Sequence, residues 1–435
     1  MEWERVDRYA ERMRTLNIYE DFGGPSLSLR AWQELSAIRP TDLLPNLQSL
    51  EWLSVTDTFR YINLFLSPHL TSLNVRVIPG IPNVGPILAS LPVKTLGELR
   101  FLDHSGDRAV QDVISQLVLK TTAALRSIQV SSDLSDAAFR HIARLPHLSD
   151  ASVNFVSLGR LSSSSDVAFP SLRTLETRVD SAGGWKYFLG NTKNVYSTVL
   201  HSRIALEQEE IVNVFRFLID KGFHQTIHEL SFAVSQPYNL TPQVLTPLLG
   251  FKSLTRLSVT SSCDPARCNS RLTKEALALL AEALPRLVEL FLGGAQCRSP
   301  TREVTLTDLS PLSAHCVHLE TLQIHFSAVD IQTDVPDDVL SSSSEQEPPS
   351  PNHSRLFQLV VGALPVSTSE KSLLIVAYLL LQMFPKLSML RWTVENSRWK
   401  KVQEHIDTFQ KYRLKKQSTR REVATCLFSL VYSRN

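Results

Sequence analysis

The stretch Leu44-Pro-Asn-Leu47-Gln-Ser-Leu50-Glu-Trp52 contains the pattern that decides the fold of this chain. Two leucines three residues apart are followed, two residues later, by a third apolar residue, which gives L-x-x-L-x-Φ. Apolar residues two apart point to the same face of a β-strand, and the residues between them point to the other face. The stretch therefore predicts a short strand with one buried face and one face left free.

The same pattern recurs along the chain, and its first apolar residue falls at positions 13, 47, 70, 96, 125, 148, 172, 227, 254, 287, 319, 356 and 387. The intervals run from 23 to 37 residues, apart from one of 55 residues, which a degenerate copy near Val199-Leu200 would divide. Leucine-rich repeats have units of about 20–29 residues, with longer units where the outer helix is extended.

The spacing predicts an α/β fold, a leucine-rich-repeat solenoid of about fourteen irregular units over residues 1–395. Parallel strands need a crossover of a dozen or more residues, which the intervals supply as helices. The expected shape is a curved horseshoe with parallel strands on its concave face and helices on its convex face. Separate α/β domains with ordinary Leu-rich cores are the alternative.

Several intervals carry helix signals. Residues Asp107–Lys120 place apolar side chains at i, i+3, i+4, i+7 and i+8. Ser135 is expected to cap a helix over Asp136–Leu145, and Thr273 one over Lys274–Leu284. The segment Ser369–Phe384 is apolar all round, which indicates a helix buried on more than one side.

The pattern is interrupted inside the chain and changes at both ends. The Ser/Pro/Glu-rich segment Ser341–Ser354 predicts a disordered insertion, since it has no apolar surface to bury. Gly183-Gly184-Trp185 is interpreted as a turn. At the N-terminus, Trp3–Met13 predicts a helix running into the first strand, so we expect the cap of the repeats to come from a partner or from residues missing from this sequence. Residues 396–435 are expected to form a C-terminal cap of one helix and one strand.

Composition narrows the class of protein. Lys and Arg number 45 against 43 Asp and Glu, so the net charge of +2 gives no whole-chain attraction to nucleic acid or to anionic membranes. The five cysteines are widely spread, as in proteins of a reducing compartment, and no apolar run approaches the length of a membrane span. A cytoplasmic or nuclear protein is expected.

The sequence contains none of the common catalytic, nucleotide-binding or metal-binding motifs. No P-loop, dinucleotide-binding, G-x-S-x-G or H-E-x-x-H motif occurs. Asp103-His104-Ser105 cannot form a relay, because adjacent strand residues point in alternate directions. Cys263 and Cys268 lack the further ligands of a zinc site. We therefore predict no enzyme, no catalytic residue, no cofactor and no metal. Two alternatives remain: a hydrolase or transferase site on convex loops near 180–205 and 260–300, or nucleic-acid association through the basic run Lys411–Arg421.

The predicted concave face supplies the candidate binding residues. Because the residues between the buried positions of each strand point away from the helices, their side chains are available to a ligand. Their charges are mixed, which favours a protein client over a phosphate backbone. The candidates are Glu51, Asn74, Arg76, Arg100, Arg178, Arg256, Glu289, Phe291, Gln323, His325 and Arg391.

Three segments resemble a known family: Trp3–Leu16, Leu44–Trp52 and Val376–Leu387 are similar to the F-box/leucine-rich-repeat proteins of mushroom-forming fungi. The resemblance implies that the repeats present substrates to a cullin-based ubiquitin ligase. In that family an N-terminal F-box binds a Skp1-type adaptor. No F-box segment is evident in this sequence. The resemblance therefore implies only the substrate-recognition role, with an adaptor as partner only if an F-box lies upstream of Met1.

Overall fold

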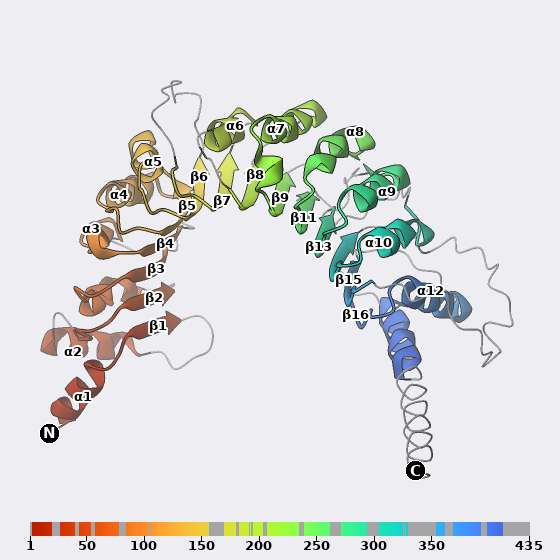
Figure 1. Cartoon of the computed structure of the whole chain (residues 1–435). Coiled ribbons are helices and arrows are strands. Elements are labelled where there is room, and N and C mark those ends of the chain that lie inside the picture. The colour runs from red at the N-terminus through yellow and green to blue at the C-terminus, as the bar shows by residue number, and fades with distance from the viewer. Residues whose placement is uncertain are drawn as a thin grey trace, which may run out of the picture. The chain divides into compact units, whose positions relative to one another are not determined.

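The computed structural model describes residues 2–19, 27–39, 43–53, 57–77, 84–103, 106–155, 169–179, 182–190, 192, 195–202, 207–234, 239–261, 271–293, 304–324, 326, 328, 354–361, 369–392 and 398–411. The chain divides into two compact units, Met1–Arg203 and Ile204–Asn435. Both units are built from short parallel strands joined through helices (Figure 1).

Unit 1 contains eight strands among its described residues, each paired in parallel with the next in chain order. They are β1 (Thr15–Tyr19), β2 (Ser49–Leu53), β3 (Ser72–Val77), β4 (Glu98–Asp103), β5 (Ser127–Asp133), β6 (Asp150–Phe155), β7 (Thr174–Val179) and β8 (Ser197–Ser202). The helices are α1 (Glu2–Ala10), α2 (Leu29–Ile38), α3 (Val84–Ala89), α4 (Arg108–Leu119), α5 (Asp136–Ala143) and α6 (Ala182–Gly190), with 3-10 turns at Asp57–Phe65 and Val93–Thr95.

Unit 2 repeats this arrangement. Its parallel sheet contains β9 (Glu229–Val234), β11 (Arg256–Ser261), β13 (Glu289–Leu292), β14 (Thr321–Ile324), β15 (Gln358–Val361) and β16 (Met389–Trp392). A small parallel pair joins β10 (Asn239–Leu240) to β12 (Arg271–Leu272). The helices are α7 (Gln208–Asp220), α8 (Pro242–Leu245), α9 (Lys274–Ala283), α10 (Ser310–His315), α12 (Glu370–Met383) and a last helix over 398–411, with 3-10 turns at Phe223–Gln225, Thr246–Gly250 and Thr307–Leu309.

In many repeats the residues that lead up to the first apolar position of the pattern form a tight turn just before the strand. The amide of Leu47 donates to the carbonyl of Leu44 (3.1 Å), and the amide of Leu254 donates likewise to Phe251 (3.0 Å). Every strand whose repeat was located by its first apolar residue begins two residues after that position, from Thr15 to Met389. The turn thus fixes where each strand starts.

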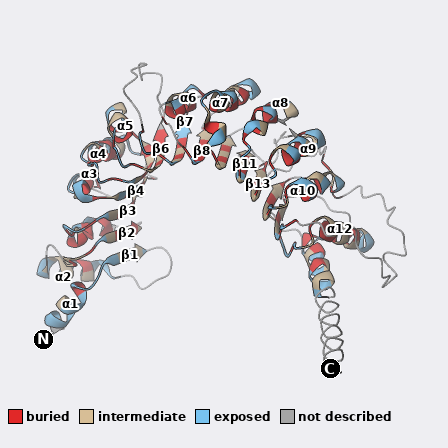
Figure 2. Cartoon of the chain, in the orientation of Figure 1, coloured by how far each residue is buried: buried red, intermediate tan, exposed pale blue. Residues whose placement is uncertain are grey.

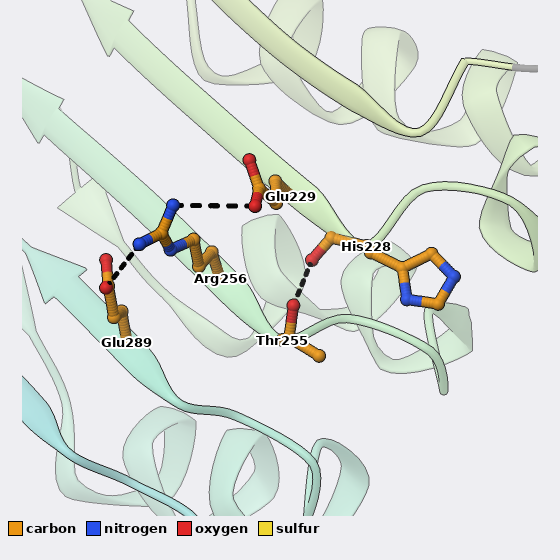
Figure 3. Close-up of polar contacts among 5 residues, drawn as sticks. All are labelled: His228, Glu229, Thr255, Arg256 and Glu289. Atoms are coloured by element: carbon orange, nitrogen blue, oxygen red, sulfur yellow. Dashed lines mark hydrogen bonds and ion pairs between the residues drawn. The ribbon is translucent and has the colours of Figure 1, made fainter. Parts of the chain in front are cut away.

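Backbone hydrogen bonds then lock each repeat to the one before it. The carbonyl of His228, just before β9, accepts the amides of both Thr255 (2.8 Å) and Arg256 (3.0 Å) from the next repeat. The Thr255 hydroxyl donates to the same oxygen (3.0 Å, Figure 3). Equivalent double bonds join the other described neighbours within each unit, such as Ser149 and Asp150 to Arg126. The strands therefore start in the same register from one repeat to the next, and β5 and β6 shift register only further along, between Val130 and Asp133.

Alternation along the strands separates a core from a free face. In β2, Leu50 and Trp52 are fully buried, whereas the residues on either side of them are half-exposed. The helices of each unit cover the face that carries the buried residues, and Figure 2 shows the core between strands and helices. We call the opposite face of each sheet the open face.

The fold predicted from the sequence, an α/β leucine-rich-repeat solenoid with parallel strands, is confirmed. The expected helices form at α4, α5, α9 and α12, and the side chains of Ser135 and Thr273 accept the capping hydrogen bonds predicted for them.

The interpretation of Gly183-Gly184-Trp185 as a turn is wrong. These residues lie in α6, where Trp185, Phe188 and Leu189 are fully buried. Burial of three large side chains outweighs the poor helix propensity of two glycines.

Two predicted segments lie outside the described residues: all of the insertion 341–354 except Ser354, and the C-terminal strand near 423–432. The helix over 398–411 is present, with Trp399, Val402 and Ile406 buried along it and Phe409 half-buried. Among the residues that the structure describes, no helix is long and apolar enough to cross a bilayer.

Candidate protein-binding surface

The open faces carry the residues that the sequence predicted as ligand contacts. In unit 1 they lie on four strands, and in unit 2 on another four. Glu51 is on β2, Asn74 and Arg76 on β3, Arg100 on β4, Arg178 on β7, Arg256 on β11, Glu289 and Phe291 on β13, Gln323 on β14 and Arg391 on β16. His325 lies outside the described residues. Each of the ten described side chains is half-exposed or exposed and alternates with buried neighbours.

Parallel register brings some of these residues together and keeps others apart. Glu51, Asn74 and Arg100 are direct register partners across β2, β3 and β4. Arg76 lies two residues further along β3, diagonal to Arg100. Arg178 is three strands from β4, which corresponds to about 14 Å at the usual spacing of strands.

Glu51 is held by uncharged donors on the strands at both sides. The hydroxyl of Tyr19, on β1, donates to one carboxylate oxygen, and the amide of Asn74 donates to the other at 2.5 Å. The bond to Glu51 raises the pKa of the exposed Tyr19 phenol. Sequence reasoning did not select Tyr19, because the first repeat was identified from its leucine spacing and not from the polar residue at its end.

A second polar cluster lies at the other end of unit 1 and consists of Ser152, Glu176 and His201 on β6, β7 and β8. His201 Nε2 lies 3.6 Å from Glu176 Oε1, and the Ser152 hydroxyl donates to Glu176 Oε2 at 2.9 Å. His201 most strongly lowers the pKa of Glu176, and Ser152 adds to it, although burial opposes the shift.

This cluster does not have the order of a hydrolase triad. The carboxylate stands between the hydroxyl and the imidazole, so Ser152 donates to an acid and not to a ring nitrogen that could take its proton. Ser152 and His201 were not among the predicted site residues. His201 was missed because its repeat was recognised only as a degenerate copy.

In unit 2 an ion-pair ladder crosses three strands. Arg256 on β11 extends one guanidinium nitrogen to Glu229 on β9 (3.4 Å) and another to Glu289 on β13 (2.6 Å), as Figure 3 shows. The three residues are direct register partners. About half of the Arg256 side chain is exposed, so the ladder is solvated and its energy is screened by water.

The row next to this ladder combines apolar and polar residues. Phe291, Gln323, Val360 and Arg391 are register partners across β13, β14, β15 and β16. Beside them, Met389 is exposed (38%), and its sulfur accepts a contact from Arg391 Nε at 3.2 Å. This part of the open face therefore carries an aromatic ring on β13 and, three strands away, an arginine beside Val360 and Met389. Aromatic residues and arginine are enriched at binding hot spots.

Charge on the open face of unit 1 is divided unevenly between paired and unpaired groups. Two of the acids accept bonds from neutral side chains: Glu51 as above, and Glu98 from the Ser72 hydroxyl at 3.2 Å. Within the described part of the chain, no carboxylate lies within ion-pair distance of Arg76, Arg100 or Arg178.

Other kinds of site receive no support from the described residues. No group of three or more His, Cys, Asp or Glu there could hold a metal ion. The predicted thiols Cys263 and Cys268 lie outside the described residues, as does the basic run beyond Lys411. Cys316 is buried below β14 with its thiol 3.7 Å from the carbonyls of Ala281 and Leu284, and burial raises its pKa to about 12.

No family model matches the chain. A search of the curated proteins also finds no match.

Proposed function

We propose that this protein is a recognition module that binds a protein client on the open faces of its strands. The proposal is supported by the regular arrangement of side chains on these faces. Charged and apolar side chains lie in register across neighbouring strands, and hydrogen bonds between the repeats fix the backbone that carries them. A rigid, pre-ordered surface of this kind loses little side-chain entropy when a partner binds.

The mix of residues favours a protein over a nucleic acid. Glutamates occupy the open face beside the arginines, as at Glu229 and Glu289 next to Arg256. A phosphate backbone would be repelled by those carboxylates and would require a consistently basic stripe. A folded or extended polypeptide, with charges of both signs, can match such a surface.

The resemblance to F-box/leucine-rich-repeat proteins leads to a narrower form of the proposal. In that form the chain is the substrate-binding region of a ubiquitin ligase receptor, and the client on the open face is the protein to be modified. The adaptor-binding module would have to be supplied by sequence upstream of Met1.

Site-specific photo-cross-linking tests the proposal. A benzophenone amino acid replaces Phe291 on the open face of unit 2 or, as the matched control, Leu279 on the outer side of α9, which is 39% exposed. Each variant is added to a lysate and irradiated. We expect the variant with the probe at position 291 to form discrete protein adducts that the variant with the probe at position 279 does not form. Identical adduct patterns at the two positions, or none at position 291, would contradict the proposal.

A further inference from the structure

Arg76 and Arg100 are adjacent cations on the open face of unit 1, and neither has an acidic partner among the residues that the structure describes. They lie on β3 and β4, diagonally across the strand pair, because the register partner of Arg76 is Leu102, two residues beyond Arg100. At ordinary strand spacing and rise their Cα atoms are about 8 Å apart. Two guanidinium groups at this separation can both reach one carboxylate.

The neighbouring acids do not neutralise this pair. Glu51 is engaged by Tyr19 and Asn74, and Glu98 by Ser72, all through neutral donors. In unit 2, by contrast, Arg256 is paired with glutamates on both sides. The same kind of position is therefore neutralised in one unit and left available in the other.

Arg76 shows a second sign of an incomplete site. Its Nε is shielded from solvent and has no hydrogen-bond acceptor among the described residues. The side-chain oxygen of Asn74, Oδ1, lies two residues earlier on the same face. It is likewise shielded from solvent and accepts no hydrogen bond from the described residues. A shielded polar group without a partner is unfavourable, and an incoming peptide could supply both an acceptor and a donor after small side-chain movements.

Apolar residues flank the two arginines. Leu53 on β2 and Leu102 on β4 are the register partners of Arg76 on its two sides, and both are half-exposed on the open face. Leu53, Arg76 and Leu102 thus form a row across β2, β3 and β4. Arg100 lies two residues before Leu102 on β4. Glu51 and Glu98 lie close by, so a run of several acids would be repelled, whereas a single carboxylate would not have to approach them.

We propose that Arg76 and Arg100 together bind one carboxylate of an extended client segment, an Asp or Glu side chain flanked by apolar residues that pack on Leu53 and Leu102. This proposal rests on the proposed function, since it assigns the chemistry of the client at one place on the open face. Bidentate arginine–carboxylate contacts combine charge with geometry, so lysine cannot fully replace either residue.

Selection from a random peptide library displayed on phage tests the assignment. The full chain and its Arg76→Gln/Arg100→Gln variant are panned in parallel. The structure predicts that peptides selected by the wild type are enriched in an acidic residue between apolar ones, and that this enrichment disappears with the double variant. Acidic peptides selected equally by both proteins would contradict the proposal.

Fluorescence anisotropy with the most enriched peptide supplies the quantitative test. Arg76→Gln and Arg100→Gln are each expected to weaken binding by about tenfold or more, and replacing the peptide's acid by its amide should have the same effect. Arg76→Lys should recover only part of the affinity. The matched control is Arg108→Gln, which removes the same charge at an exposed position on α4. Equal losses in the control would contradict the assignment.

The possible outcomes distinguish the two proposals. Selection of peptides without acids supports a protein-binding open face and overturns the role of the arginine pair. In another outcome no peptide is selected, but a labelled single-stranded DNA binds and its binding requires Arg76 and Arg100. That result overturns both proposals and makes phosphate the ligand of the two arginines. If neither a peptide nor the DNA binds, the role of the arginine pair is overturned, and cross-linking at position 291 tests the protein-binding open face independently.

Discussion

Trp52 and Leu53 are neighbours on β2, yet Trp52 is fully buried while the Leu53 side chain is half-exposed on the open face. The Trp52 ring packs at 5.7 Å from Trp32 and 5.8 Å from Phe65, measured between ring centroids. We expect Trp52→Ala to lower the free energy of unfolding by about 3–5 kcal/mol, since it empties this aromatic cluster.

The control for that substitution is the adjacent residue. Leu53→Ala removes a half-exposed side chain and should cost about 1 kcal/mol or less. Urea denaturation followed by far-UV circular dichroism measures both. Similar losses for the two variants would mean that the side chains of β2 do not alternate as described.

The Arg256–Glu289 pair should contribute little to stability. Its geometry is close, at 2.6 Å, but the arginine side chain is about half exposed. A double-mutant cycle with alanine at both positions should give a coupling energy of about 1 kcal/mol or less, reduced further in 1 M salt. A coupling several times larger and insensitive to salt would show that the ladder is buried from water.

Glu176 makes stability depend on pH in the acidic range. Its folded-state pKa is lowered, chiefly by His201. The stabilisation is therefore fully present above the unfolded-state pKa, near 4.3, and is lost as pH falls through the folded-state value. Glu176→Gln should cost about 1 kcal/mol at pH 6, and this difference from the wild type should shrink below pH 4. A difference that stays constant from pH 6 to pH 3 would rule out this contribution.

Cys316 should be unreactive in the native protein. Its thiol is buried, and because its pKa is raised to about 12 it stays protonated at neutral pH. Iodoacetamide treatment at pH 8, followed by peptide mass spectrometry, is expected to leave Cys316 unmodified until denaturant is added. Rapid native alkylation at this position would show that the core between α9, α10 and β14 opens readily.

The sequence allowed the strands to be placed because many repeats carry the same turn just before the strand. Leu47 and Leu254 mark the start of their strands by a local hydrogen bond three residues back, and such a local rule can be read without knowing the fold. The repeat at β8 was harder to find because Thr198 occupies the buried position that leucine holds in most other strands. The Thr198 hydroxyl is buried there and has no hydrogen-bond partner among the described residues.

The candidate surface could be predicted only in part. Strand alternation predicts which side chains point away from the helices, and the ten described candidates do so. The partners of each charge depend on register between repeats and on side-chain rotamers, which a single sequence does not encode locally. For this reason Arg256 could not be distinguished in advance as ion-paired, nor Arg76 and Arg100 as lacking an acidic partner among the described residues.

The affinity for the protein that cross-links at position 291 shows whether a client binds on the open faces. One variant replaces Arg100, Phe291 and Arg391 on the open faces by alanine, and a second replaces Arg108, Leu279 and Lys371 on the helices. The account predicts that the open-face variant loses at least about tenfold in affinity while the helix variant binds like the wild type, both remaining folded. Equal affinity of the two variants, or a loss confined to the helix variant, would contradict it.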